Sequence, residues 1–287
     1  MNFRLSFFLF SFITSGILFP RVKKMTIEQA LKSKAASVQV NNVTGYSGKC
    51  LGLKVLNLLN DSLCLKITPG WIFDSDDSTK QDLLVVKEFL FALSAGQSKS
   101  DYVFANCCQK SKISPVRSKF SKNRMANSEL KTLAEFLNEG DYDSKIVCNA
   151  VWAVSDNAPI SNICGGTNEK DLLLRKKVSE IKRKAVPWYN VITETKELAD
   201  GRIETVQKSL YGEFTCNLSR GTEFNVSLKD RHGREIMILQ KRVKTKDDLQ
   251  NYYVEFFVEH LPKKEFFITV TDIHGVDIIK KPIDLRL

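Results

Sequence analysis

The sequence predicts a mainly β protein with a helical insert: a β-sandwich-like N-terminal domain with two or three helices, then a smaller β-sandwich. Three observations predict this class. Residues 36–108 contain short apolar runs separated by turn residues, which is typical of antiparallel β domains. Between residues 127 and 184 the apolar spacing becomes that of helices. From Val186 onward the chain again alternates like strands and contains an internal repeat.

The first β region contains five apolar runs. Residues 36–43 alternate as in a strand. Residues 49–58 and 62–68 flank a turn-forming Asn-Asp pair and are expected to form a β-hairpin. The further strands expected at 83–90 and 100–108 complete a domain that we place at residues 36–165.

Three helices are expected after these strands. Asn127 or Ser128 caps the first, and Gly140 ends it. The second, residues 144–154, is apolar almost all round, with Asn149 and Ser155 on its polar side, so it should pack against a sheet. The third, residues 168–184, is strongly charged and belongs to a helix and linker region that spans residues 166–206.

The last part of the chain, residues 207–287, carries the repeat. Two segments of this region, Val226–Ile236 and Ile268–Ile278, align without a gap. The pattern of each predicts a strand, an Asp-x-His-Gly turn and a returning strand. His232 and His274 occupy the same turn position, where we expect a left-handed backbone rather than a shared metal site.

Composition narrows the class of protein. The chain has 287 residues, of which 43% are apolar, and 43 Lys+Arg against 33 Asp+Glu. This length holds one large domain or two ordinary ones. The apolar share excludes a disordered chain, and the absence of a glycine repeat, heptads or several long apolar runs excludes collagen-like, coiled-coil and polytopic membrane proteins.

The first 24 residues resemble a targeting segment. An almost unbroken apolar run, Leu5 to Phe19, lies between basic residues. We expect residues 1–24 to be a secretory signal peptide, with cleavage near Gly16, or an uncleaved anchor. The protein would then be secreted, periplasmic or on the cell surface. A start at Met25 would instead give a cytosolic protein.

Loss of residues 1–24 removes four basic residues and no acidic one, which lowers the net charge from +10 to +6. Much of the remaining positive charge lies in residues 110–124 and 170–184. Phe120 is the only aromatic residue in the first stretch, so we interpret it as a solvated loop and expect no nucleic-acid partner.

The common catalytic and metal motifs are missing from the sequence. It contains no nucleophile elbow, zinc-protease helix, P-loop or dinucleotide fingerprint. The acidic loop 74–78 lacks the glycine and the final glutamate of an EF-hand, and no cysteine pair has C-x-x-C spacing. We therefore expect neither a metal nor a cofactor, and the sequence does not favour an enzyme.

The segments Tyr102–Gln109 and Val147–Ala153 carry the most information. A strand that ends in Cys107-Cys108, followed later by a helix with a tryptophan, resembles bacterial surface thioester domains over residues 100–155. In that family a strand cysteine is joined to a helix glutamine. Here Cys148 stands at the glutamine position, and Gln81 and Gln109 lie outside the motif, so no thioester can form there.

The resemblance implies that two cysteines meet. In an oxidising compartment Cys148 could pair with Cys108, which matches the thioester cysteine, or with Cys107. Only one of these neighbours can face the helix because strand side chains alternate. A Cys108–Cys148 bridge would contribute about 4 kcal/mol. The alternative is that Cys148 is a buried, small apolar residue. With seven cysteines, at least one must be free or pair between chains.

The C-terminal part is similar to the immunoglobulin-like modules at the ends of many bacterial surface and secreted proteins, which implies a sorting, adhesion or accessory role. We therefore predict a secreted or cell-surface, non-enzymatic binding or scaffold protein with an unidentified protein or surface polymer as partner. The protein would contact the membrane only through residues 1–24, and only if this segment is not cleaved. The alternative is a thiol-dependent enzyme or covalent adhesin that uses a reactive cysteine of the first domain.

Overall fold

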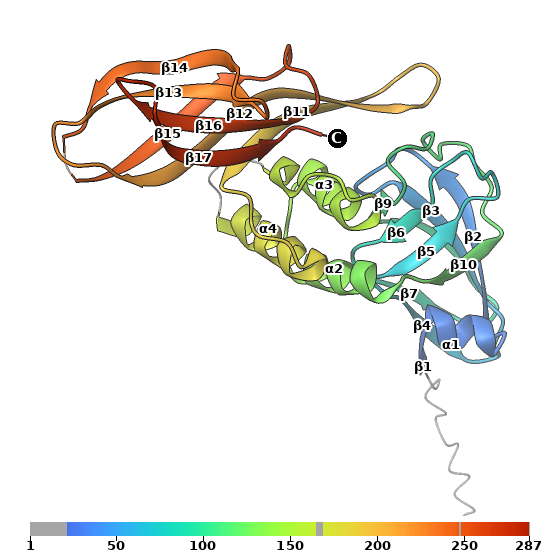
Figure 1. Cartoon of the computed structure of the whole chain (residues 1–287). Helices are drawn as coiled ribbons and strands as arrows, with labels where there is room; N and C mark the ends of the chain where they lie inside the picture. The colour runs from blue at the N-terminus through green and yellow to red at the C-terminus, as the bar shows by residue number, and fades with distance from the viewer. Residues whose placement is uncertain (1–21, 165–168, 247, 287) are drawn as a thin grey trace, which may run out of the picture.

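The computed structural model describes residues 22–164, 169–246 and 248–286. It is mainly β, with helices α2, α3 and α4 between an N-terminal and a C-terminal β region (Figure 1). The predicted fold class is confirmed. None of the helices in the described ranges is long and apolar enough to cross a lipid bilayer.

The N-terminal β region consists of three small sheets. Their strand orders are β1-β4-β7, β2-β3-β8 and β10-β5-β6-β9. The strands are β1 (Val22–Thr26), β2 (Ala36–Val43), β3 (Leu51–Asn57), β4 (Ser62–Ile67), β5 (Trp71–Asp74), β6 (Leu83–Val85), β7 (Phe89–Leu93), β8 (Ser98–Val103), β9 (Ala105–Cys107) and β10 (Lys122–Met125), and the short helix α1 spans Ile27–Lys32.

The prediction of a β-hairpin around residues 59–61 is wrong, because β3 and β4 do not pair with each other. β3 pairs with β2 and β8, whereas β4 pairs with β1 and β7, so the chain changes sheet at this turn. The side chain of Asn57 stabilises this change from one sheet to the other. Its buried amide donates to the carbonyls of Asp61 (2.9 Å) and Ser94 (2.8 Å), which fixes the corner between the two sheets.

The segment 1–24 lies mostly outside the described residues, which begin at Val22. Residues 22–24 form the first part of β1, which runs parallel to β4. The Lys23 ammonium lies 3.1 Å from the Asp61 carboxylate. These three residues are therefore part of a sheet, and a start at Met25 would remove three of the five residues of β1.

The helices cover one face of the β10-β5-β6-β9 sheet. Trp71, Phe73 and Leu83 face the β core, whereas Ile72 and Leu84 pack with the helices. The helices are α2 (Ser128–Glu139), α3 (Ser144–Ser155) and α4 (Glu169–Lys182), with a 3-10 turn η1 (Ile160–Asn162) before α4. The expectation that the apolar helix packs against a sheet is confirmed.

Capping contacts define the helix ends. The Asn127 side chain accepts a hydrogen bond from the backbone N–H of Leu130 (2.9 Å), as expected for an N-cap. Lys87 lies between β6 and β7 and donates to the carbonyls of Leu137 (2.7 Å), Asn138 (3.2 Å) and Gly140 at the end of α2. The strand that we expected at 83–90 is divided into β6 and β7, and Lys87 lies between them with its ammonium bound to the last carbonyls of α2.

The prediction that Asn149 lies on a polar face of α3 is wrong. Its side chain is buried, and its amide donates to the Asn162 carbonyl at 2.7 Å. A buried amide needs such a partner. Asn149 therefore ties α3 to the turn η1 instead of facing solvent.

The C-terminal region is a β-sandwich of two packed sheets. Their strand orders are β11-β12-β15 and β14-β13-β16-β17. Alternate residues such as Phe224, Val226 and Phe266 fill the space between the sheets. The strands are β11 (Tyr189–Glu197), β12 (Ile203–Asn217), β13 (Glu223–Asp230), β14 (Glu235–Lys244), β15 (Leu249–Phe257), β16 (Glu265–Asp272) and β17 (Asp277–Asp284).

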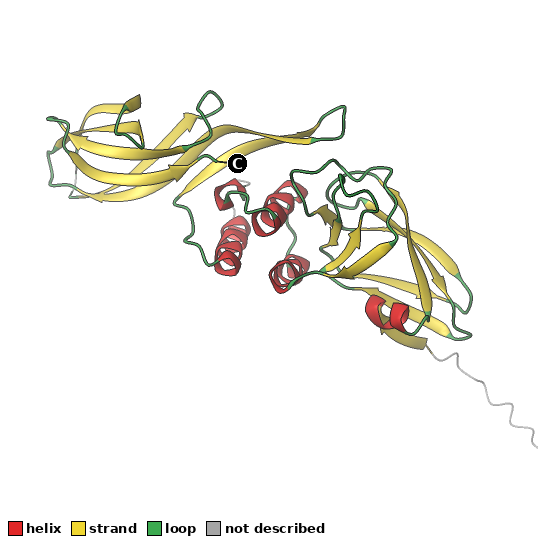
Figure 2. Cartoon of the chain, turned by 45° about the vertical axis from the view of Figure 1, so that its right-hand side comes forward, coloured by secondary structure: helices red, strands yellow, loops and turns green. Residues whose placement is uncertain are grey.

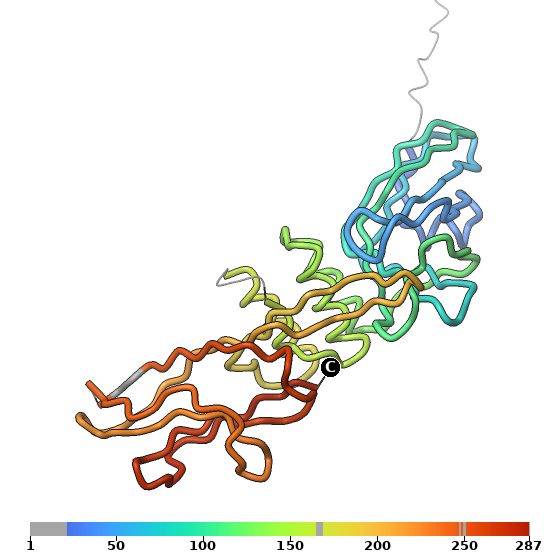
Figure 3. The backbone as a smooth tube through the Cα atoms, turned by 90° about the horizontal axis from the view of Figure 1, so that it is seen from above, coloured from blue at the N-terminus to red at the C-terminus, as the bar shows by residue number. Residues whose placement is uncertain are grey.

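The β11–β12 hairpin leaves the sandwich and reaches the N-terminal region (Figures 2 and 3). Its tip is bound there, because the Ser114 N–H donates to the Gly201 carbonyl at 2.7 Å and Ile113 forms a β-bridge with Arg202. Much of the segment that we expected to be linker is thus strand, since β11 covers Tyr189–Glu197 and β12 begins at Ile203. The strand β12 therefore belongs to the sandwich and also contacts the first domain.

The two copies of the repeat form matching hairpins. The Asp230 carboxylate accepts from the N–H of His232 (2.9 Å) and of Arg234 (3.1 Å), and Asp272 accepts from the equivalent N–H groups. The left-handed residues are Gly233 and Gly275, with φ of 77° and 86°, and not the histidines. Glycine takes this conformation without a Cβ clash, so the expectation for the histidines is wrong.

The Asp230 side chain should make the C-terminal sandwich sensitive to acid. Burial raises the pKa of this carboxyl group, but hydrogen bonds from Arg234 and from the His232 backbone outweigh burial and lower the pKa to about 2. Because the folded pKa is depressed, this stabilisation is complete above the ordinary value of 3.8 and disappears as the pH falls through about 2. We expect Asp230→Asn to lower the urea midpoint at pH 7 and to weaken the acid dependence. Asp272→Asn is the matched control, since its exposed turn lacks the arginine contact, and an equal effect of both variants would contradict this explanation.

Candidate functional site

The candidate cysteines lie where the sheet meets α3. Cys107 ends β9, Cys108 follows it, and Cys148 lies on α3. All three are buried free thiols, as are the other cysteines apart from the half-buried free thiol of Cys64. The structure therefore contains neither the Cys108–Cys148 bridge nor a Cys107–Cys148 bridge.

The three thiols pack in different surroundings. As expected from strand alternation, Cys107 faces the β core and Cys108 faces the helix core. Cys148 belongs to neither core and packs with Trp152 and Ile203. Each sulfur thus fills space in a different apolar cluster, which is the structural role that we considered as the alternative to a bridge.

The pKa values of these thiols are all raised. Burial is the largest cause for Cys107, Cys108 and Cys148, and the nearby thiol of Cys148 raises the pKa of Cys107 further. The neighbouring side chain of Asn106 lowers the pKa of Cys148 and opposes the effect of burial only in part. Burial likewise raises the pKa of Cys50 to about 12. Since the thiolate is the nucleophile, this environment suppresses thiol chemistry at neutral pH.

Trp152, one helical turn after Cys148, connects three parts of the chain. Its side chain is 1% exposed, and its ring stacks on Tyr46 with ring centroids 6.3 Å apart and 15° between the planes. Ile203, at the start of β12, packs on the same cluster. The Lys110 ammonium lies 5.7 Å from the ring centroid of Trp152. This cluster therefore holds the β11–β12 hairpin against α3 and the first sheet region.

A cleft of about 440 Å³ lies beside this cluster, between the two domains. This volume is within the range of small-molecule sites, which often occur at domain interfaces. The first domain contributes the loop after β9 and the end of α3, and the C-terminal domain contributes β12 and the loop after β15. The lining residues are Lys110, Ser111, Asp156, Ala158, Ile203, Glu204, Thr205 and Lys263.

Two lysines give the cleft its charge. Lys110 is half-buried, and its pKa is lowered first by burial and then by the charge of Lys263. Neither ammonium group forms an ion pair or a hydrogen bond with the described residues. Of the two acidic lining residues, Glu204 pairs with Lys196 at 3.1 Å, whereas Asp156 accepts from the Ser155 hydroxyl at 2.5 Å.

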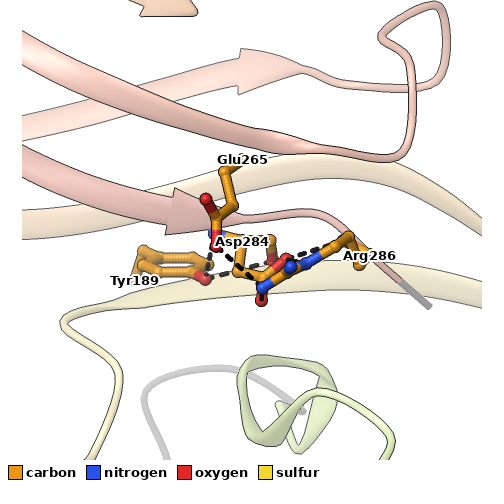
Figure 4. A network of polar contacts seen from close by, with 4 residues as sticks. All are labelled: Tyr189, Glu265, Asp284 and Arg286. Atoms are coloured by element: carbon orange, nitrogen blue, oxygen red, sulfur yellow. Dashed lines mark hydrogen bonds and ion pairs between the residues drawn. The ribbon is translucent and has the colours of Figure 1, made fainter. Parts of the chain in front are cut away.

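A second cavity, of about 360 Å³, shares Ala158 with this cleft and lies next to Lys184, Tyr189, Asp284 and Arg286. Its arginine is already neutralised, because Arg286 contacts Asp284 (2.7 Å) and Glu265 (2.8 Å) (Figure 4). The Tyr189 hydroxyl accepts from the Asp284 N–H at 2.7 Å. We interpret these contacts as structural, because they join the start of β11 to the end of β17 at one end of the sandwich.

Sequence reasoning missed the cleft. From the sequence, Lys110 belongs to a stretch that we interpret as a solvated basic loop. No local pattern indicates that Lys263, 153 positions later, lines the same cleft. Gln81 and Gln109, the glutamines outside the thioester motif, bind elsewhere: the Gln81 amide donates to the Lys112 carbonyl (3.1 Å), and Gln109 donates to Asp82 (2.6 Å).

Fold and site together define a mainly β protein in which an N-terminal and a C-terminal region meet at a lysine-bearing cleft, with the buried thiol of Cys148 close to the lining residue Ile203. Comparisons with protein-family profiles, curated proteins and solved structures find no match for this chain. Within the part of the chain that the structure describes, no three His, Cys, Asp or Glu side chains are grouped so that they could hold a metal ion.

Proposed function

We propose that this protein is a secreted or cell-surface binding protein without catalytic chemistry, and that the interdomain cleft is its binding site. The location rests on the signal-like segment at residues 1–24. One observation supports the binding role above all: the cleft is built by both domains and lined by two lysines that form no ion pair in the described structure. Charged groups without partners in a concave site are typical of a place that a ligand completes.

The alternative, a thiol-dependent enzyme or covalent adhesin, fits these surroundings less well. Such a protein needs an accessible cysteine with a lowered pKa. Cys107, Cys108 and Cys148 are each at most 3% exposed, and their pKa values are raised. Lys110 would favour a thiolate at Cys148, but the effect of burial is larger.

Alkylation of the full chain separates the two functions. The native protein is treated with iodoacetamide at neutral pH, and the modified cysteines are located by mass spectrometry over time. We expect the half-buried Cys64 to react first, and Cys107, Cys108 and Cys148 to stay unmodified until the protein unfolds. In guanidinium chloride all seven thiols should react. Modification of native Cys107 or Cys148 faster than free glutathione would favour the thiol-dependent function and contradict this proposal.

A further inference from the structure

We infer that the interdomain cleft binds a small molecule through an anionic group, a carboxylate or a phosphate, which Lys110 and Lys263 contact from opposite domains. This inference rests on the proposed binding function and adds the class of ligand. It follows from the charges that line the cleft and from the way in which each is already compensated.

The two lysines leave a positive charge that the described residues do not neutralise. Lys110 follows β9, and Lys263 lies between β15 and β16. Both residues line the same cleft, and the positive charge of Lys263 contributes, after burial, to the lowered pKa of Lys110. An anion bound by both lysines would compensate this charge with two charge-assisted hydrogen bonds.

The acidic residues of the cleft do not cancel this charge. Glu204 is engaged with Lys196 on the neighbouring strand β11. Asp156 is the one carboxylate of the lining without an ion pair in the described structure, and its charge stabilises protonated Lys110. Two ammonium groups and one uncompensated carboxylate leave a net positive site. Asp156 could also accept a hydrogen bond from a hydroxyl or amine of the same ligand.

The surroundings of Lys110 make its charge available to a ligand. Its ammonium lies above the Trp152 ring, and this cation–π contact holds the group without neutralising it. Arg286, in the second cavity, contrasts with this arrangement because two carboxylates already bind it. The lysine-bearing cleft is therefore the better anion site of the two.

The position of the cleft also predicts a structural consequence. Lys110 and Asp156 belong to the first domain, whereas Thr205 and Lys263 belong to the second. An anion that contacts both lysines would add a connection across the domain junction. Ligand binding should therefore stabilise the junction as well as the cleft.

Trp152 provides a direct readout of binding. The full chain, labelled with ¹⁵N, is titrated with inorganic phosphate and with acetate at constant ionic strength, with glucose as a neutral probe and ethanolamine as a cationic one. We expect phosphate or acetate to shift the indole N–H signal of Trp152, which lies beneath Lys110. The signals of Trp71 and Trp188 should stay unchanged, and glucose and ethanolamine should have no effect.

Matched variants identify the residues that bind. Lys110→Gln and Lys263→Gln should each weaken binding of the anion by about tenfold, the usual effect of losing one charge-assisted hydrogen bond. Lys246→Gln makes the same charge change near the opposite end of β12 and should leave binding unchanged. Equal weakening by all three variants would indicate net charge alone and overturn the inference.

The outcomes separate the inference from the function on which it rests. If neither anion shifts Trp152, or if glucose or ethanolamine shifts it instead, the ligand class is wrong even when the cysteines remain unreactive. If native Cys148 is alkylated rapidly, the proposed function itself is wrong. Folding of each variant is checked by its unfolding midpoint before titration.

Discussion

Replacing Trp152 by alanine should lower the free energy of unfolding of the first domain by about 3–5 kcal/mol, the range measured for large aromatic residues in protein cores. Trp152 is almost completely buried and contacts Tyr46, Ile203 and Cys148. Its removal leaves a cavity where α3, the first sheet region and β12 meet. The measurement is denaturant unfolding followed by circular dichroism.

Trp152→Phe is the control for this cavity, because it keeps most of the apolar volume and should cost less than half as much. The alanine variant should also release the hairpin tip, so that a protease cuts faster between residues 198 and 202. A loss below about 1 kcal/mol, the scale of an ordinary surface change, would show that the cluster does not join the domains.

The second large effect is expected at Arg175, a buried residue of α4. Its guanidinium donates to the side-chain oxygen of Asn190 and to the carbonyls of Pro187 (2.8 Å) and Tyr189 (2.9 Å). These acceptors lie at the start of β11, so Arg175 fixes the connection between the domains. Arg175→Met should cost about 3 kcal/mol, because buried acceptors lose charge-assisted hydrogen bonds.

Arg175→Lys tests the geometry of this contact. Lysine keeps the charge but cannot present the planar fork of donors that reaches three acceptors, so most of the loss should remain. Both variants should make residues 183–188 more sensitive to limited proteolysis, whereas Lys176→Gln on the same helix should not. Wild-type stability and proteolysis in Arg175→Met would contradict this role.

Local sequence patterns predicted many elements of the fold. The alternation of residues 36–43 coincides with β2, and the cap at Asn127 begins α2. These features depend on neighbouring residues alone. The pairing of β3 and β4 could not be predicted in this way, because the turn between them is compatible with a return into the same sheet and with a crossing to another. The buried amide of Asn57 decides between these paths.

The candidate site shows the same limit. The opposite orientations of Cys107 and Cys108 follow from strand alternation and are confirmed. The position of Cys148 depends on how α3 is rotated against the sheet, and that rotation places it with Trp152 and Ile203. The partner cluster includes a residue of the β11–β12 hairpin, whose path to the first domain has no local sequence signature.

The resemblance to thioester domains stays a prediction about the strand and helix order of residues 100–155. With Cys148 at the glutamine position, this region can keep a strand cysteine and a helix tryptophan without a covalent bond between strand and helix. In this account the tryptophan has another use, since it forms the floor beneath Lys110.

The central claim is that ligands bind in the interdomain cleft, and a cleft-filling variant tests it most directly. The exposed Ser111 lines the cleft, so Ser111→Trp should fill it, whereas Ala95→Trp adds the same side chain at the exposed β7–β8 turn. Melting temperatures of the full chain are measured with a panel of small carboxylates and phosphates. The account predicts that a stabilising ligand acts on the wild type and on Ala95→Trp but not on Ser111→Trp; equal stabilisation of all three proteins would contradict it.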